Sequence, residues 1–353
     1  MAKKKETPPP TGLRDLKRDL AAGTPGTLYI FHGEETYLRD YYLERLKAAL
    51  IPAGMESFNH HRLRGKDLEG NLRLLEDRLD ALPMMSPRTL IQVDDYDLFG
   101  APEEERDRMI RILSDLPDYC CLVFLYDISA YKVDGRMRKL AGFLREKARE
   151  VYFSPQGQSH LVDWIGRRFQ ALDHDISVRD AEYLIFLCGD LMNGLIGEIA
   201  KIGAYARRRR VTREDIDAVA VPQIDAVVFR MTDALTQGRF DLAFSILSDM
   251  LLLKQEPIVI LAVLGKHIRQ LHSARAALEN GKGRQWLQEV WSMHSYPAGK
   301  LMEDARRHDL AWCRWAMARC AQTDLEMKSV TGADSRDRLI SLMLELSAGG
   351  PPC

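Results

Sequence analysis

The sequence lacks an excess of charge of either sign. Its 353 residues hold 50 Lys and Arg against 51 Asp and Glu, which gives a formal net charge of −1. This balance excludes a chain that holds nucleic acid or a membrane surface by bulk positive charge. Hydrophobic residues make up 46% of the chain, so an acidic disordered protein is excluded as well. Any contact with a polyanion therefore has to come from local basic clusters.

Long apolar runs and a secretory signal are also missing. No stretch reaches the ~18 uninterrupted apolar residues that a membrane span needs. The opening, MAKKKETPPP, passes from basic residues into prolines instead of an apolar segment. These features predict a cytoplasmic protein that makes no contact with a membrane.

Cysteine is scarce, and its spacing suits neither disulfides nor a metal. The six cysteines, at positions 120, 121, 188, 313, 320 and 353, form no C-x-x-C pair. A disulfide framework is not expected in so large a cytoplasmic chain, and no Cys and His set has the spacing of a zinc site. The histidines show no nucleophile-triad pattern, and G-x-S-x-G does not occur. We expect reduced thiols, no metal and no catalytic residue.

The first part of the chain alternates short apolar runs with helical patterns. Strands are predicted at residues 28–31, 57–63, 89–93, 120–126 and 150–153, and helices at residues 34–50 and 67–79. Almost continuous apolar strands that are separated by helices indicate a parallel sheet covered on both faces. Residues 1–153 are therefore predicted to form an α/β domain.

The strand signals disappear after residue 153. Ser159, Ser177 and Thr212 are placed to cap three helices, and a further helix is predicted over residues 192–206. These four short helices predict a small helical domain at residues 154–220. Longer helical patterns at residues 225–236, 240–253, 258–278, 311–329 and 334–346 predict an all-α domain at residues 221–353.

The loop after the first strand lies where a mononucleotide-binding α/β domain carries its phosphate loop. Such a loop is rich in glycine and supplies a Lys followed by Ser or Thr at the helix N-terminus. Here the residues are His32, Gly33, Glu34 and Glu35, so the Lys is missing and two carboxylates are present. Each carboxylate would repel a triphosphate by roughly 1 kcal/mol or more. We expect no ATP hydrolysis and no bound cofactor, and the glutamates alternatively do no more than favour a helix N-terminus.

Residues 82–88, Leu-Pro-Met-Met-Ser-Pro-Arg, lie between a predicted helix and a predicted strand. This loop carries Leu82 and two adjacent thioethers, Met84 and Met85, and methionine suits adaptable binding surfaces. Two interpretations remain: the side chains fill the core, or they anchor a partner. Residue composition alone favours the core.

A basic cluster lies at the end of the small helical domain. Six positive charges fall within 13 residues that contain no acid: Lys201, Arg207, Arg208, Arg209, Arg210 and Arg213. Such a run is usually a solvated helix end. It could also contact nucleic-acid phosphate, so Arg207 to Arg210 are candidate DNA contacts.

Five short patterns occur in a fixed order along the chain. They are LYIFHGEE at residues 28–35, the turn at 82–88 with LIQV at 90–93, GDL at 189–191 with EIAK at 198–201, VVFRMTDAL at 227–235 with QEP at 255–257, and DLEMK at 324–328. As an ordered set these patterns resemble the delta-subunit family of the bacterial DNA polymerase III clamp loader. The resemblance covers nearly the whole chain.

The resemblance implies a fold and a function. The fold is a RecA/AAA-like parallel-sheet domain with a degenerate phosphate loop, then a helical lid and a C-terminal helical collar. The function is a subunit of a DNA-directed DNA polymerase (nucleotidyltransferase) holoenzyme that opens the sliding clamp for loading onto primed DNA, without hydrolysing ATP itself. The implied partners are the beta clamp, primed DNA, and the gamma/tau and delta prime subunits in a hetero-pentamer.

The resemblance also changes the interpretation of the turn. In the family, two adjacent hydrophobic residues of this turn, usually Leu-Phe, enter a pocket on the clamp. Met84 and Met85 occupy these places here, so the resemblance implies that Leu82, Met84 and Met85 bind the clamp. An active AAA-type ATPase or DNA-remodelling protein remains the alternative, and it requires nucleotide binding at the Gly33 loop.

Overall fold

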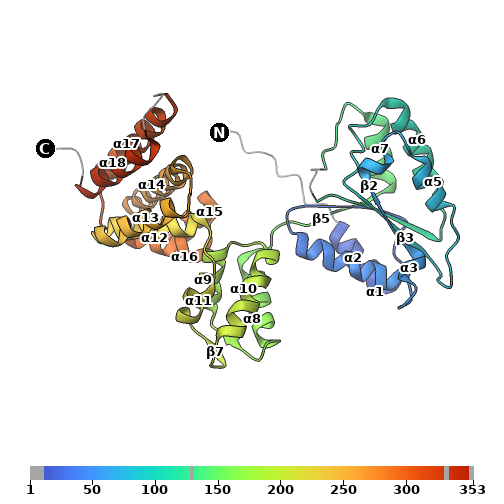
Figure 1. The fold of residues 1–353 in the computed structure, drawn as a ribbon, viewed down its shortest axis with the longest axis horizontal. Coiled ribbons are helices and arrows are strands. Elements are labelled where there is room, and N and C mark those ends of the chain that lie inside the picture. Colours follow the sequence, from blue (N-terminus) through green and yellow to red (C-terminus); the bar gives the residue numbers. More distant parts are fainter. Residues whose placement is uncertain (1–11, 128–130, 330–333, 350–353) are drawn as a thin grey trace. The chain divides into compact units, whose positions relative to one another are not determined.

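The computed structural model describes residues 12–127, 131–329 and 334–349, and the chain divides into two compact units (Figure 1). The N-terminal unit extends to Gln156 and includes Leu191–Asn193. The C-terminal unit comprises Gly157–Asp190 and the chain from Gly194 onward. The predicted boundary near residue 153 lies close to the division at Gln156, whereas the boundary between residues 220 and 221 stays a prediction.

The N-terminal unit is built on a five-stranded parallel sheet. In chain order the strands are β1 (Leu28–His32), β2 (His60–Arg64), β3 (Thr89–Asp94), β4 (Cys120–Leu125) and β5 (Arg149–Tyr152). They are arranged in the order β2-β3-β4-β1-β5, and every neighbouring pair is parallel. All six residues of β4 are buried because this strand is central and has helices on both sides. The predicted parallel α/β domain is confirmed.

Alternate residues of the strands supply two separate cores. Leu122 and Phe124 of β4 face one core, while Cys121 and Val123 face the other, as the two-residue period of a strand requires. Helices α4 to α7 cover the first core, and α1 and α2 cover the second. The bounds of these helices are α1 (Gly12–Ala22), α2 (Thr36–Leu50), α3 (Glu56–Asn59), α4 (Gly65–Leu68), α5 (Arg73–Leu79), α6 (Glu103–Ser114) and α7 (Arg138–Lys147).

Two local predictions in this unit were wrong. The strand predicted at residues 57–63 begins only at His60, because the residues before it form the short helix α3. The helix predicted at residues 67–79 is split into α4 and α5. Gly70 lies between them with φ +68°, a left-handed conformation that ends a helix.

The C-terminal unit begins with the four short helices that the sequence predicts. They are α8 (Gln158–Gln170), α9 (Val178–Cys188), α10 (Met192–Tyr205), whose first two residues belong to the N-terminal unit, and α11 (Arg213–Val219). Between them, β6 (Asp175–Ile176) pairs in parallel with β7 (Arg210–Val211), which corrects the prediction that strands end at residue 153. Strands of two residues are too short to produce a periodic pattern.

The remaining helices of this unit pack around α14. They are α12 (Ile224–Thr236), α13 (Phe240–Leu252), α14 (Pro257–Glu279), α15 (Arg284–Trp291), α16 (Ser295–Asp304), α17 (Leu310–Ser329) and α18 (Ser335–Ser347). Ile260, Leu264 and Ile268 of α14 lie in a core shared with α12, α13, α17 and α18. The five long helices that the sequence predicts are all present, and α15 and α16 were missed. In the described ranges no single helix could span a membrane, and α9 with α10 passes the length and composition test only as a pair bent by 119°.

Candidate protein-binding turn and phosphate-loop position

Three apolar side chains are exposed on the segment that joins α5 to β3. The exposed fractions are 76% for Leu82, 53% for Met84 and 81% for Met85. The interpretation that these side chains fill the core is therefore wrong. Single exposed apolar residues are ordinary, but three within four residues form a local apolar surface that suits contact with a protein.

A buried asparagine holds the backbone of this turn. The Met84 N–H donates to Oδ1 of Asn59 at 2.8 Å, and Nδ2 of Asn59 donates to the Met84 carbonyl at 2.9 Å. The same Nδ2 donates to the Met55 carbonyl at 2.9 Å. Met85 follows with φ +50°, in the left-handed region that a residue with a side chain rarely adopts. The turn therefore has a defined backbone although its apolar side chains are exposed.

The far side of the turn is fixed as well. The hydroxyl of Ser86 donates to the carbonyl of Arg88 at 2.8 Å. The guanidinium of Arg88 then donates to the carbonyls of Pro25, Gly26 and Cys120, at 2.7, 3.1 and 2.9 Å. These bonds join the start of β3 to the segments that enter β1 and β4. Both ends of the turn are thus attached to the sheet.

The backbone at the phosphate-loop position is engaged by the segment that follows β5. Gly33 has φ +125°, and a Cβ at this position would lie 2.3 Å from the carbonyl oxygen of Phe153. The Glu35 N–H donates to that same oxygen at 3.0 Å, and the Phe153 N–H donates to the His32 carbonyl at 2.8 Å. The backbone N–H of Glu35 is therefore bonded to a protein carbonyl and is not available to a phosphate group.

The acidic side chains of this loop also have protein partners. Glu35 is fully buried, and its Oε2 accepts from the Met192 N–H at 3.2 Å. Glu34 accepts from the hydroxyl of Tyr152 at 2.6 Å, and this bond raises the pKa of Tyr152. His32 lies 3.0 Å from Oε1 of Glu150. Protein donors thus engage the carboxylates of both Glu34 and Glu35.

Arg39, the first cation in the sequence of α2, forms its bonds within the fold. Arg39 of α2 is buried, and its guanidinium donates to Asp127 at 2.8 Å and to the Tyr126 carbonyl at 3.0 Å. A second ion pair joins it to Asp40 at 2.8 Å. No local sequence pattern singles out Arg39, because its partner Asp127 is 88 residues away. This arginine supports the end of β4 and does not replace the missing Lys.

The basic cluster is exposed and extends beyond the helix end. Helix α10 ends at Tyr205, and all four arginines from 207 to 210 are exposed. Arg209 pairs with Asp175 at 2.9 Å, and Arg210 lies in β7. The interpretation as a helix end is therefore only partly right, while contact with nucleic-acid phosphate stays a prediction.

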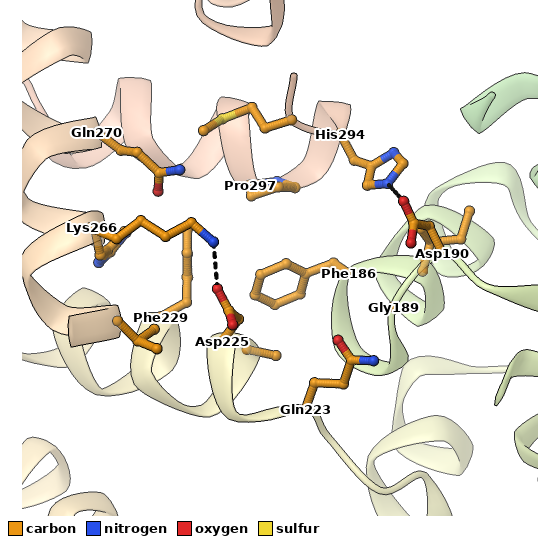
Figure 2. A pocket seen from close by; sticks show the side chains of 15 residues that line it. Phe186, Gly189, Asp190, Gln223, Asp225, Phe229, Lys266, Gln270, His294 and Pro297 are labelled. Carbon is orange, nitrogen blue, oxygen red and sulfur yellow. Dashed lines mark hydrogen bonds and ion pairs between the residues drawn. The ribbon is translucent and has the colours of Figure 1, made fainter. Parts of the chain in front are cut away.

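The C-terminal unit contains a cavity of about 350 Å³ between α9, α12, α14 and the start of α16 (Figure 2). Lys266 pairs with Asp225 at 2.7 Å, and His294 lies 3.5 Å from Asp190. Behind them His267 packs against the ring of Phe229 with 4.4 Å between the ring centres. Burial lowers the pKa of His267 to about 3, so its imidazole is neutral. The cavity is thus lined by apolar side chains and by two pairs of oppositely charged or polar groups, Lys266 with Asp225 and His294 with Asp190. Among the residues that the structure describes, no group of three or more His, Cys, Asp or Glu could bind a metal.

In comparisons with known proteins, a family model, two curated relatives and a solved structure all point to the same kind of protein. Residues 225–344 match the family model described as DNA polymerase III delta subunit, C-terminal domain. The DNA polymerase III subunit delta of Bacillus subtilis is 24% identical over 344 residues, which cover 94% of this chain and 95% of that protein. The probable DNA polymerase III subunit delta of Aquifex aeolicus is 20% identical over 263 residues, covering 72% of each. The structure of the Bacillus subtilis DNA clamp loader delta protein matches with a TM-score of 0.52 and 21% identity, over 95% of this chain and 99% of that one.

The parallel sheet in the order β2-β3-β4-β1-β5, followed by helical regions, gives this chain an AAA-like fold, the fold of the Bacillus subtilis DNA clamp loader delta protein. Over nearly its whole length the chain is similar to the DNA polymerase III subunit delta of Bacillus subtilis, and its residues 225–344 match the C-terminal domain of the delta subunit.

Proposed function

We propose that this chain binds the sliding clamp and opens it for loading onto primed DNA, with Leu82, Met84 and Met85 as the anchors. The supporting observation is that these apolar side chains are exposed on a turn whose backbone is already fixed. In the family that the sequence resembles, two adjacent hydrophobic residues of this turn enter a clamp pocket. Anchors of this kind contribute most of the affinity of a protein interface.

The methionine pair sets the expected strength of this contact. Burying a Met side chain contributes about 1.5–3 kcal/mol, and fixing its rotamers costs about 0.5–1.5 kcal/mol. A Phe anchor offers a more rigid surface than Met. Each Met is thus expected to contribute on the order of 1 kcal/mol net, and the fixed backbone removes the further cost of ordering the turn.

We also propose that the chain itself does not hydrolyse ATP. The support is the missing Lys, the carboxylates of Glu34 and Glu35, and the Phe153 carbonyl that accepts the Glu35 N–H. ATP hydrolysis by neighbouring subunits would then control when the turn is free to bind the clamp.

The assembly that we propose is a hetero-pentamer with gamma/tau and delta prime subunits. The C-terminal helices would form the shared collar, and Leu252 and Leu253 at the end of α13 present exposed apolar side chains there. Primed DNA would be held in the assembled complex, with Arg207 to Arg210 as candidate phosphate contacts.

The test is the affinity of the full chain for its purified cognate sliding clamp, measured by surface plasmon resonance. Met84→Ala combined with Met85→Ala is expected to weaken binding by about 10- to 100-fold, because the net contributions of two anchors are lost. Val133→Ala is the matched control, since Val133 is another apolar residue of the N-terminal unit that is 49% exposed. Clamp binding that is unchanged in the double variant would overturn the assignment of the anchors.

A further inference from the structure

The exposed turn depends on one side chain from another part of the sequence. Asn59 is fully buried, which is uncommon for an asparagine. Its amide pairs with both the N–H and the carbonyl of Met84, as a neighbouring strand would, although the two residues are 25 positions apart. The Nδ2 bond to the Met55 carbonyl fixes the amide against α3. The amide group thus connects a buried helix end to the exposed turn.

We propose that Asn59 is a positioning residue, which holds Met84 and Met85 in the conformation that binds the partner. This inference rests on the function proposed above. Met85 has φ +50°, and a chain without support would leave this conformation for more favourable ones. The apparent dissociation constant rises in inverse proportion to the fraction of molecules that are competent to bind. The Asn59 bonds therefore act on affinity without any contact between Asn59 and the partner.

The competing explanation is that Asn59 only stabilises the fold. The two explanations differ in where the effect of a substitution appears. A positioning effect acts through the Met84 and Met85 side chains, so it disappears once those side chains are removed. A general loss of stability persists in their absence and adds to their effect.

The experiment is a double-mutant cycle on the full chain, measured as affinity for the purified cognate sliding clamp. Asn59→Ala is expected to raise the dissociation constant about tenfold. This is the increase expected if the substitution reduces the fraction of molecules whose turn can bind the clamp by about tenfold. The same substitution is expected to have no further effect in the chain that carries Met84→Ala and Met85→Ala. Asn71→Ala, at an exposed asparagine of the same unit, is the matched control.

Asn59→Asp is a second variant that tests the same positioning role if Asn59→Ala folds poorly. Asn59→Asp keeps the volume and the acceptor for the Met84 N–H, but it turns a carboxylate oxygen toward the carbonyls of Met84 and Met55. It should weaken clamp binding and speed hydrogen exchange in the peptide that carries residues 82–87. Exchange in the β4 and α14 peptides should stay as in the wild type, which separates a local effect from unfolding.

The possible outcomes separate the inference from the function on which it rests. If the methionine variant loses affinity while both Asn59 variants bind like the wild type, the positioning role is overturned and the clamp-binding role stands. Additive losses in the cycle also overturn the positioning role. If the methionine variant binds like the wild type, the clamp-binding function fails, and the positioning role fails with it.

Discussion

Gly33 shows how a single residue shapes the position that a phosphate loop would occupy. Gly33 has φ +125°, and a Cβ at this position would lie 2.3 Å from the carbonyl oxygen of Phe153. There is therefore no space for a side chain. The loop can therefore lie directly against the segment after β5. In this chain Gly33 allows two backbone segments to pack against each other. In a phosphate loop that binds nucleotide, glycine instead allows the backbone to approach the phosphate.

Gly33→Ala is expected to destabilise the chain by about 2–4 kcal/mol, because backbone strain and overpacking act together. Urea unfolding followed by circular dichroism measures this loss. Gly142→Ala in α7 is the matched control, since nothing lies within 4 Å of its built Cβ. That control should gain about 0.5–1 kcal/mol from helix propensity. Equal stability of the two variants would contradict the described packing at Gly33.

His267 predicts a pH dependence of stability. Burial lowers its pKa to about 3 in the folded chain, against an ordinary value of 6.5. Below pH 6.5 the unfolded chain binds a proton that the folded chain does not bind. The contribution of His267 is therefore fully present above pH 6.5 and is lost as the pH falls toward 3, by up to about 1.4 kcal/mol per pH unit.

His267→Gln removes this titration. The free energy of unfolding of the variant should fall less steeply than that of the wild type between pH 6.5 and pH 4, as measured by urea unfolding at each pH. Above pH 7 the two curves should run parallel. Identical slopes in the acidic range would show that His267 is not held neutral in the folded chain.

Single residues also show what the sequence could and could not predict. The sequence singled out Leu82, Met84 and Met85 as candidate anchors, a role that stays a prediction. Residue types alone favoured a place in the core, because exposure is decided by contacts that no local pattern contains. Asn59 was missed, since its two bonds to Met84 join positions 25 residues apart. Local motifs predict candidates, and tertiary contacts decide their roles.

At the scale of helices and strands, two of the three predicted caps were correct. Ser177 accepts the Asp180 N–H, and Thr212 forms a reciprocal capping box with Asp215, both as the sequence predicts. The predicted cap at Ser159 was wrong, because Gly157 occupies that position and Ser159 lies inside α8. The missed helices α15 and α16 are short and contain or border glycine and proline, which obscures helical periodicity.

Thr212→Ala should destabilise the chain by about 0.5–2 kcal/mol, because the capping box of α11 loses its side-chain acceptor. Ser159→Ala is the matched control: it changes an exposed residue near the start of α8 that caps no helix. The control should stay within about 0.5 kcal/mol of the wild type. Urea unfolding measures both, and a larger loss at Ser159 than at Thr212 would contradict the assigned caps.

At the scale of the whole molecule, the N-terminal unit contains both the exposed turn and the phosphate-loop position. The parallel sheet was predictable because three of its five strands, β1, β3 and β4, are almost continuously apolar. The division of the helical part into a lid and a collar was inferred from helix length and from the family resemblance. Helix patterns reveal which face is buried, but they do not reveal which helices share one core.

The full chain is expected to show no heat of binding when it is titrated with Mg-ATP by isothermal calorimetry. The reason is that Glu34 and Glu35 replace phosphate donors and the Phe153 carbonyl takes the Glu35 N–H. Titration of the same preparation with the sliding clamp is the control for a competent protein. Tight binding of Mg-ATP would overturn the non-hydrolysing role and favour an active AAA-type ATPase.

The attachment of the turn has a consequence for how this protein can change over evolutionary time. Every hydrogen bond described above that shapes the turn comes from the N-terminal unit: from Asn59, from Ser86, and from Arg88 with its three carbonyls. Substitutions in the C-terminal unit can therefore accumulate without removing any of the hydrogen bonds that shape the turn. If the proposed clamp-binding role of the turn and the proposed collar role of the C-terminal helices hold, the two surfaces can diverge independently.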